Sequence, residues 1–276
     1  MRSGMLTVLV VSLLVVAGCL GGGGPVTDGE SDGSSSAGDG GSSAGESDSG
    51  GDGGGVADSD EFDVGETERL LREAGSFTAT WSYATTENGE TATITDTYRV
   101  DLRENRSLET FTMTGAESQT DFETFVADGS AYTRYAADGE AFYQSRPQDD
   151  TAFQSAVDRG AISYETVDDA RFVGTETFDG VTVDRYEYSD LAAWRQFGAG
   201  TMGSSENVTV TDFTVAVLVD EDGLARQTTW TLTGETDAGE TVSVEWRYEV
   251  TDVGSTSVPD PDWLDEARAQ GSGAGS

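Results

Sequence analysis

Alternation between apolar and polar residues runs through most of the chain after residue 75 and predicts β-strands. In the first run the apolar positions share one face of a strand: Phe77, Ala79, Trp81 and Tyr83. In the second run the same is true of Ile94, Tyr98, Val100 and Leu102. Further strands are predicted over residues 107–114, 121–127, 131–135, 141–145, 171–178, 181–188, 208–219, 224–233 and 241–253.

Turn dipeptides that end in glycine separate these strands at short intervals and predict hairpins. They are Asn88-Gly89, Asp128-Gly129, Asp138-Gly139, Asp179-Gly180, Asp222-Gly223 and Ala238-Gly239. Consecutive hairpins without long helical crossovers exclude a parallel, doubly wound sheet. The architectures that remain are a sandwich, a barrel and one large curved sheet.

Four short helices are predicted beside the strands. The first has capping-box spacing at Asp63 and Glu66 and stops at Gly75. The second helix spans residues 150–160, and the third begins at Asp190. The fourth begins at Asp260-Pro261 and includes Trp263. Because helices are inserted between strands, we expect an α+β fold that is mainly antiparallel β. About ten strands would form a large curved sheet or half-barrel covered by short helices.

The N-terminal residues 1–18 have the three parts of an export signal. Arg2 is the positive residue, an apolar run of 12 residues follows from Met5, and small residues stand at Ala17 and Gly18. The run is shorter than the ~20 residues that a transmembrane helix needs. The single Arg2 favours a Sec-type route over a twin-arginine route.

The next residue, Cys19, is the only cysteine of the chain. The stretch from Val16 to Cys19 resembles the lipobox of prokaryotic lipoproteins, although that motif favours Leu where Val16 stands. The resemblance implies a lipid on the Cys19 thiol and a protein held on the outer face of the cell membrane. The alternatives are an ordinary cleaved signal with a chance cysteine, or a short membrane helix.

Composition divides the rest of the chain into a tether, a domain and a tail. Residues 19–60 are mostly Gly, Ser and Asp, so they bury too little apolar surface to fold, and we expect a disordered tether. Residues 61–268 form the predicted β domain, and residues 269–276 a flexible tail. With one cysteine committed to lipid, this domain folds without disulfides. We expect a monomer.

The formal net charge is -37, and all 15 basic residues are Arg. Phosphate binding needs a basic patch, so this charge excludes nucleic acid as a partner. Such a chain repels itself in dilute buffer, and molar salt screens the repulsion. The composition, poor in Lys and rich in Asp and Glu, resembles that of haloarchaeal proteins, and we expect a halophile.

Catalytic side chains are scarce. The chain contains no His and no Lys, which excludes Ser-His and Cys-His pairs, lysine Schiff bases and structural zinc sites, and we expect no enzyme, metal or cofactor. Paired carboxylates remain as an alternative at Asp168-Asp169 and at 220–222, and the latter turn is also a calcium candidate.

Two consecutive segments carry a family resemblance. Residues 174–186 form a hairpin around Asp179-Gly180, and residues 217–226 form a strand that ends in an Asp-x-x-Gly turn. Together they resemble the lipoprotein-carrier domains of the LolA/LolB and LppX/LprG type, and the order of elements extends the resemblance over most of residues 62–266. The resemblance implies an antiparallel half-barrel whose concave face, closed by helices, holds acyl chains.

Aromatic residues on the predicted strands are the candidates for lining a ligand site, the alternative being that they fill the core. These candidates are Trp81, Tyr98, Trp230 and Trp246. Two sequons, at Asn105 and Asn207, precede predicted strands and mark candidate glycosylation sites. The sequence therefore predicts a cell-surface lipoprotein that binds a lipid or another apolar molecule as carrier or sensor. The alternative is a structural or protein-interaction module of the cell envelope without a ligand.

Overall fold

The computed structural model describes residues 64–87, 89–115, 119–137, 140–161, 170–189, 191 and 208–273. The predictions for the signal peptide, Cys19, the tether, Asp168-Asp169 and Asn207 lie outside these residues. Of the helix predicted to begin at Asp190, only Leu191 is described, in helical conformation.

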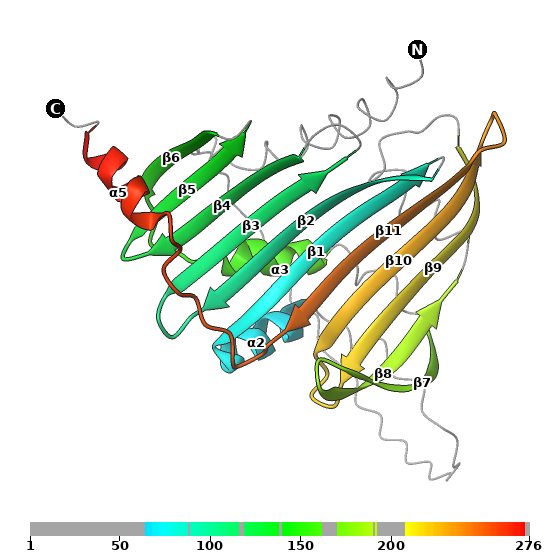
Figure 1. Cartoon of the computed structure of the whole chain (residues 1–276). Coiled ribbons are helices and arrows are strands. Elements are labelled where there is room, and N and C mark those ends of the chain that lie inside the picture. The colour runs from blue at the N-terminus through cyan, green and yellow to red at the C-terminus, as the bar shows by residue number, and fades with distance from the viewer. Residues whose placement is uncertain are drawn as a thin grey trace, which may run out of the picture. The chain divides into compact units, whose positions relative to one another are not determined.

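Eleven antiparallel strands form one open sheet in the order β6-β5-β4-β3-β2-β1-β11-β10-β9-β8-β7 (Figure 1). The strands are β1 (Ser76–Glu87), β2 (Glu90–Asp101), β3 (Arg106–Thr114), β4 (Gln119–Ala127), β5 (Ser130–Ala137), β6 (Glu140–Pro147), β7 (Arg171–Phe178), β8 (Val181–Tyr188), β9 (Val208–Asp220), β10 (Ala225–Thr236) and β11 (Thr241–Thr251). Two meanders, β1–β6 and β7–β11, join where β1 pairs with β11. The predicted fold class, a mainly antiparallel open sheet with short helices, is confirmed.

Two of the predicted turn dipeptides have positive φ at both residues, whereas Asn88 and Asp138-Gly139 lie outside the described residues. Asp128 and Gly129 have φ angles of 52° and 72°, and Asp179 and Gly180 have φ angles of 48° and 78°. Positive φ at both central residues is the mark of a type I′ turn, whose twist matches that of the flanking strands. The register of β4 with β5 and of β7 with β8 is thereby set by local sequence.

Two helices, α2 (Val64–Ala74) and α3 (Phe153–Ala161), lie against one face of the sheet, which we call the inner face (Figure 1). Leu71 of α2 is fully buried, and Phe153 of α3 packs edge-on against Phe77 of β1, with ring centroids 5.7 Å apart. α2 ends as predicted at Gly75, which has a φ of +74° and donates its N–H to the Leu71 carbonyl.

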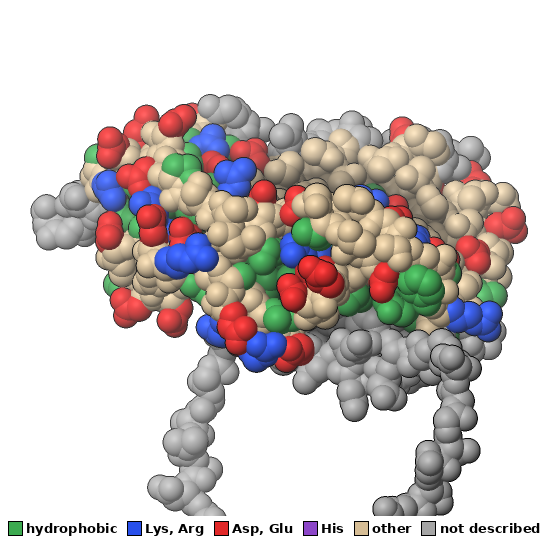
Figure 2. Space-filling view, turned by 90° about the horizontal axis from the view of Figure 1, so that it is seen from below, with side chains coloured by type: hydrophobic (Ala, Val, Ile, Leu, Met, Phe, Trp, Pro, Cys, Tyr) green, Lys and Arg blue, Asp and Glu red, His purple; other side chains and the backbone are tan. Residues whose placement is uncertain are grey.

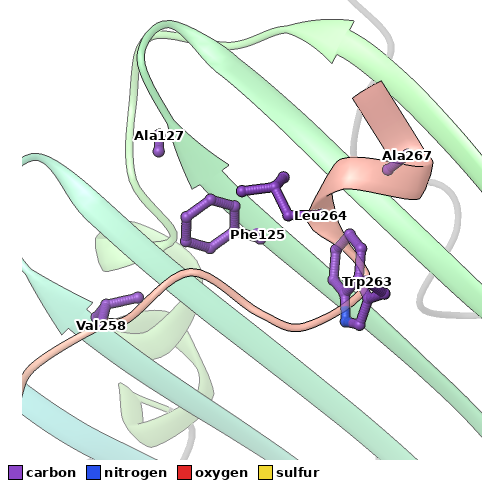
Figure 3. Packing of buried hydrophobic residues seen from close by; sticks show 6 residues of the cluster. All are labelled: Phe125, Ala127, Val258, Trp263, Leu264 and Ala267. Carbon is purple, nitrogen blue, oxygen red and sulfur yellow. The ribbon is translucent and has the colours of Figure 1, made fainter. Parts of the chain in front are cut away.

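The third described helix, α5 (Leu264–Gly273), lies with the preceding segment on the opposite, outer face, near β4–β6 (Figure 3). The prediction that Trp263 belongs to this helix is wrong. Trp263 lies in the turn before α5, where its indole N–H donates to Glu123 Oε2 at 2.7 Å and holds the segment to β4. α5 continues to Gly273, so residues 269–273 of the predicted tail are helical.

The alternation that predicted the strands separates two kinds of surface. Inner positions of the central strands are buried and apolar, with Phe77, Ala79 and Trp81 on β1 as examples. The outer positions between them are threonines and serines. No helix within the described ranges is both long and apolar enough to cross a membrane.

Candidate functional site

One rung of the sheet, meaning the residues that the strand register places opposite one another, crosses all eleven strands on the inner face. From β6 to β7 this rung consists of Phe142, Tyr135, Phe122, Phe111, Asp96, Trp81, Tyr248, Thr228, Val217, Tyr186 and Phe172. Most of these side chains are aromatic, and Asp96 is the charged one. Directly paired side chains on one face of a sheet lie close enough to interact, so the rung forms a continuous apolar band around a carboxyl group.

Burial changes along this band. Tyr248 and Trp81 near the middle are 1% and 9% exposed, whereas Tyr135 and Phe142 toward the β6 edge are 41% and 56% exposed. Between them, the rings of Phe111 and Phe122 are half-buried and stack at 4.8 Å. We call Phe111, Phe122, Tyr135 and Phe142 the Phe row. It is an apolar surface that opens progressively toward solvent.

A polar cluster of Asp96, Tyr98, Glu109 and Arg159 adjoins the inner end of the Phe row. Tyr98 donates its hydroxyl proton to Asp96 Oδ2 at 2.6 Å, and the Arg159 guanidinium of α3 lies 3.4 Å from the same oxygen. Glu109 of β3 is paired with Tyr98 across the β2–β3 ladder. Arg159 also covers the Trp81 ring at 5.1 Å from its centroid, so the cluster is joined to the aromatic band.

Burial shifts the ionisation of both carboxyl groups in the polar cluster. It raises the pKa of Asp96, against the opposing effects of the Tyr98 hydrogen bond and the Arg159 charge. Burial, together with the nearby Asp96 charge, raises the pKa of Glu109 to about 7. Glu109 is therefore only partly ionised near neutral pH. The inner face thus holds an acid that can donate a proton as well as accept one.

The four aromatic residues predicted to line a ligand site all lie on the inner face, in two groups. Tyr98 belongs to the polar cluster, and Trp81 adjoins it. Trp230 and Trp246 stack at 6.3 Å with an interplanar angle of 5°, on β10 and β11. Trp246 is buried, as is Phe213, whose ring centroid lies 6.2 Å from that of Trp230, so this second group, the Trp patch, is part of the core. Contact of any of the four predicted residues with a ligand stays a prediction.

The acidic turn after β9 has a structural role. The Asp220 carboxylate accepts hydrogen bonds from the Leu224 N–H at 2.9 Å and from Arg226 Nε at 2.6 Å, which caps the turn and pairs its charge. Within the described residues no group of three acidic, His or Cys side chains is placed to hold a metal ion. Asn105 is exposed in the β2–β3 turn, where its side-chain amide donates to the Asp149 carbonyl at 3.1 Å.

The polar cluster contains three residues that were not predicted as site residues: Asp96, Glu109 and Arg159. A signal for Asp96 exists in the sequence, because it occupies an inward position of β2 between the predicted inward residues Ile94 and Tyr98. An acid at such a position needs partners or a function. Arg159 gives no such signal, because its proximity to Asp96 depends on how α3 lies across the sheet.

A family model matches residues 4–267, described as "Family of unknown function (DUF7537)". The chain belongs to this family. No curated protein matches it significantly.

Solved structures show a distant likeness of fold. The lipoprotein LppX of Mycobacterium tuberculosis is similar over 71% of this chain and 97% of its own, at 11% identity and a TM-score of 0.36. MucB in the Pseudomonas aeruginosa MucA/MucB complex is similar over 73% of this chain, at 13% identity and a TM-score of 0.28, and the match spans 59% of that chain. A LolA superfamily protein of Nitrosomonas europaea is similar over 76% of this chain and 97% of its own, at 7% identity and a TM-score of 0.21. Because these identities and TM-scores are low, the likenesses do not indicate a function, and any functional argument must rest on the residues of this chain.

Proposed function

We propose that the inner face of the sheet binds a hydrophobic ligand and that the protein acts as a carrier or sensor of that ligand at the cell surface. The observation that carries the proposal is the partial exposure of the Phe row. Large apolar side chains that line up on neighbouring strands and stay open to solvent are typical of a binding surface. Here they continue directly from a buried, aromatic core.

Surface charge supports an uncharged partner rather than a polyanion. In the view of Figure 2, Arg side chains are interspersed with Asp and Glu side chains, and hydrophobic side chains gather between them. On the outer face, ion pairs neutralise the Arg charge, such as Arg185 with Glu187 at 2.7 Å and Arg247 with Glu245 at 2.8 Å. Paired arginines are poor sites for phosphate groups.

Binding can be tested with an environment-sensitive apolar fluorophore added to the intact protein in molar salt. We expect saturable binding, and we expect Phe122→Ala to weaken it about tenfold, because the ring lies at the centre of the row between Phe111 and Tyr135. Phe172→Ala is the matched control, since Phe172 is also an exposed ring, 58% accessible, at the far edge of the sheet. Equal loss in both variants would mean nonspecific adhesion to exposed rings and would contradict the proposal.

The alternative function, a protein-interaction module, has one observation in its favour. The edge strands β6 and β7 are exposed along most of their length, and Val173 beside Phe172 is 51% exposed. Open edges can pair with a strand of another protein. If the fluorophore does not bind at all and native mass spectrometry finds no copurified apolar molecule, this second function is favoured.

The proposal also includes the anchor at Cys19. A lipid there, followed by about 40 tether residues, would hold the domain on the outer face of the membrane, at a distance on the order of 35 Å. Cys19→Ser should release the protein into the medium or leave its leader uncleaved, as seen by fractionation and intact mass. A variant that is still processed and membrane-bound would disprove lipidation at Cys19.

A further inference from the structure

We propose that the polar cluster binds the hydroxyl end of a single-chain amphiphile whose apolar chain lies along the Phe row. This inference rests on the proposed function, because it assigns a ligand class to the same face of the sheet. Three observations support it: an unpaired acceptor, the balance of charges around it, and the length of the apolar band beside it.

The unpaired acceptor is Asp96 Oδ1. The Asp96 side chain is only 1% exposed, and although Oδ2 is paired with Tyr98 and Arg159, Oδ1 has no hydrogen-bond partner among the residues that the structure describes. A buried carboxylate oxygen without a donor is unfavourable, and such atoms in native proteins call for an explanation. A ligand that brings an O–H group to Oδ1 supplies the missing donor.

The charges around Asp96 select against an anionic head group. Two carboxyl groups, Asp96 and Glu109, face one guanidinium, that of Arg159. A carboxylate or phosphate entering here would meet like charges in a poorly solvated site. A neutral hydroxyl avoids this repulsion and brings no additional charge out of water. Arg159, whose side chain is 35% exposed, and the half-buried Glu109 are the members that solvent reaches, so we expect the head group to enter past them.

The part of the apolar band from Asp96 to Phe142 is slightly longer than one lipid chain. From Asp96 on β2 to Phe142 on β6 the rung makes four strand-to-strand steps, through Phe111, Phe122 and Tyr135. At ~4.8 Å a step the band spans about 19 Å. Half of the ~30 Å hydrocarbon core of a bilayer, about 15 Å, is the reach of a single chain. An amphiphile with its hydroxyl at Asp96 would therefore lie over Phe111 and Phe122 and reach Tyr135 on β5, one strand short of the exposed β6 edge.

The inference can be tested with probes that share one chain and differ in the head group: dodecanol, dodecylamine and dodecanoate. Each competes with the bound fluorophore on the intact protein in molar salt, at about pH 8, where dodecanoate is ionised. We expect dodecanol to bind about tenfold more tightly than dodecanoate, because it gains the hydrogen bond and avoids the repulsion. Asp96→Asn should abolish this preference, since Asn is uncharged and turns one acceptor into a donor. Phe122→Ala should weaken the binding of all three probes equally.

Thr228→Val is the matched control for Asp96→Asn. Thr228 lies on the same rung, is fully buried and has an Oγ1 without a hydrogen-bond partner in the described ranges, but it is separated from Asp96 by Trp81 and Tyr248. Its variant should keep the preference for dodecanol. If Asp96→Asn does not fold, Glu109→Gln serves instead and should narrow the preference about threefold by removing one negative charge.

The possible failures of the two proposals differ. Tight dodecanoate or dodecylamine binding, at or above the affinity of dodecanol, would overturn the hydroxyl assignment and leave the apolar site standing. A preference for dodecanol that survives both Asp96→Asn and Glu109→Gln would also overturn it. Failure of all three probes and of the fluorophore to bind would instead overturn the proposed function.

Discussion

The inner and outer faces of this sheet are built from the same strands but use their side chains differently. On the inner face, β1 and β2 present Phe77, Trp81 and Ile94 to the core, and Tyr98 donates a hydrogen bond to Asp96 Oδ2 there. On the outer face, the same two strands present threonines, such as Thr80 beside Thr97 at 3.4 Å. Since side chains alternate along a strand, the face rather than the strand carries the function.

The segment that covers the outer face shows a second difference. Phe125, Val258, Trp263 and Leu264 form a closed cluster between β4 and the C-terminal segment (Figure 3). The Phe row, on the other side of the same strands β3–β6, remains partly open. The same strands therefore carry one apolar surface that the protein's own chain covers and one that stays partly exposed. Mutations on the two faces should therefore have different consequences.

The largest effect is expected for Trp246→Ala in the Trp patch. Trp246 is 5% exposed and stacks on Trp230, so truncation leaves a large cavity in the inner core. We expect a loss of about 3–5 kcal/mol in the free energy of unfolding, measured by denaturant titration in molar salt. A loss below about 1 kcal/mol would mean that the patch is not part of the core, and it would then become the better candidate for the ligand site.

A smaller effect is expected for Trp263→Ala on the outer face. Trp263 is 9% exposed and its indole donates to Glu123, but the segment it anchors is packed on the sheet from outside. We expect a loss of about 2 kcal/mol, expressed mainly as faster hydrogen exchange in α5 and β4. Ligand binding on the inner face should be unchanged. A loss of binding in Trp263→Ala would show that the two faces are coupled.

These differences indicate which parts of the molecule the sequence could predict. Strands and their facing follow from local alternation, and the turn at Asp128-Gly129 follows from residues that accept positive φ. The pairing of β1 with β11 joins segments more than 150 residues apart (Thr78 with Thr251), and no local pattern encodes it. The polar cluster was missed for the same reason, because Arg159 reaches Asp96 only through the placement of α3 on the sheet. The sequence around Trp263 predicted a helix that begins at Asp260-Pro261 and includes Trp263. In the structure the hydrogen bond to Glu123 instead holds Trp263 in the turn before α5.

The next effect concerns the ionisation of Glu109 on the inner face. Its pKa is about 7 in the folded protein, against an ordinary value of 4.5, so the folded state binds more protons than the unfolded state between these values. The stability contributed by this group is therefore present below pH 4.5 and is lost as the pH rises to about 7. Glu109→Gln removes this loss. Relative to wild type, the variant should gain on the order of 1–2 kcal/mol between about pH 5 and about pH 8.

For Glu66→Gln on α2 we expect the opposite change of stability with pH. A hydrogen bond from Arg69 lowers the pKa of the exposed Glu66, so this group stabilises the fold above its ordinary pKa and loses that effect as the pH falls. Its variant should lose stability relative to wild type as the pH rises. Unfolding titrations of wild type and both variants at several pH values, in one salt concentration, measure the differences. Parallel curves for Glu109→Gln and wild type would show that Glu109 is not buried among like charges.

The smallest effect compares one substitution on the two faces, Thr228→Val and Thr80→Val. Thr228 on the inner face is fully buried, and its Oγ1 has no partner in the described part of the chain, so replacing the hydroxyl by a methyl group removes an unpaired polar atom and adds apolar contact. We expect a gain of about 0.5–1 kcal/mol. Thr80 on the outer face is half-buried and its hydroxyl lies beside that of Thr97, so we expect a change within about 0.5 kcal/mol, in the direction of a loss. Both variants are measured by thermal and denaturant unfolding. If Thr80→Val gains as much unfolding free energy as Thr228→Val, the hydroxyl groups of the outer threonines do not stabilise the fold. The two faces would then differ only in how deeply their side chains are buried.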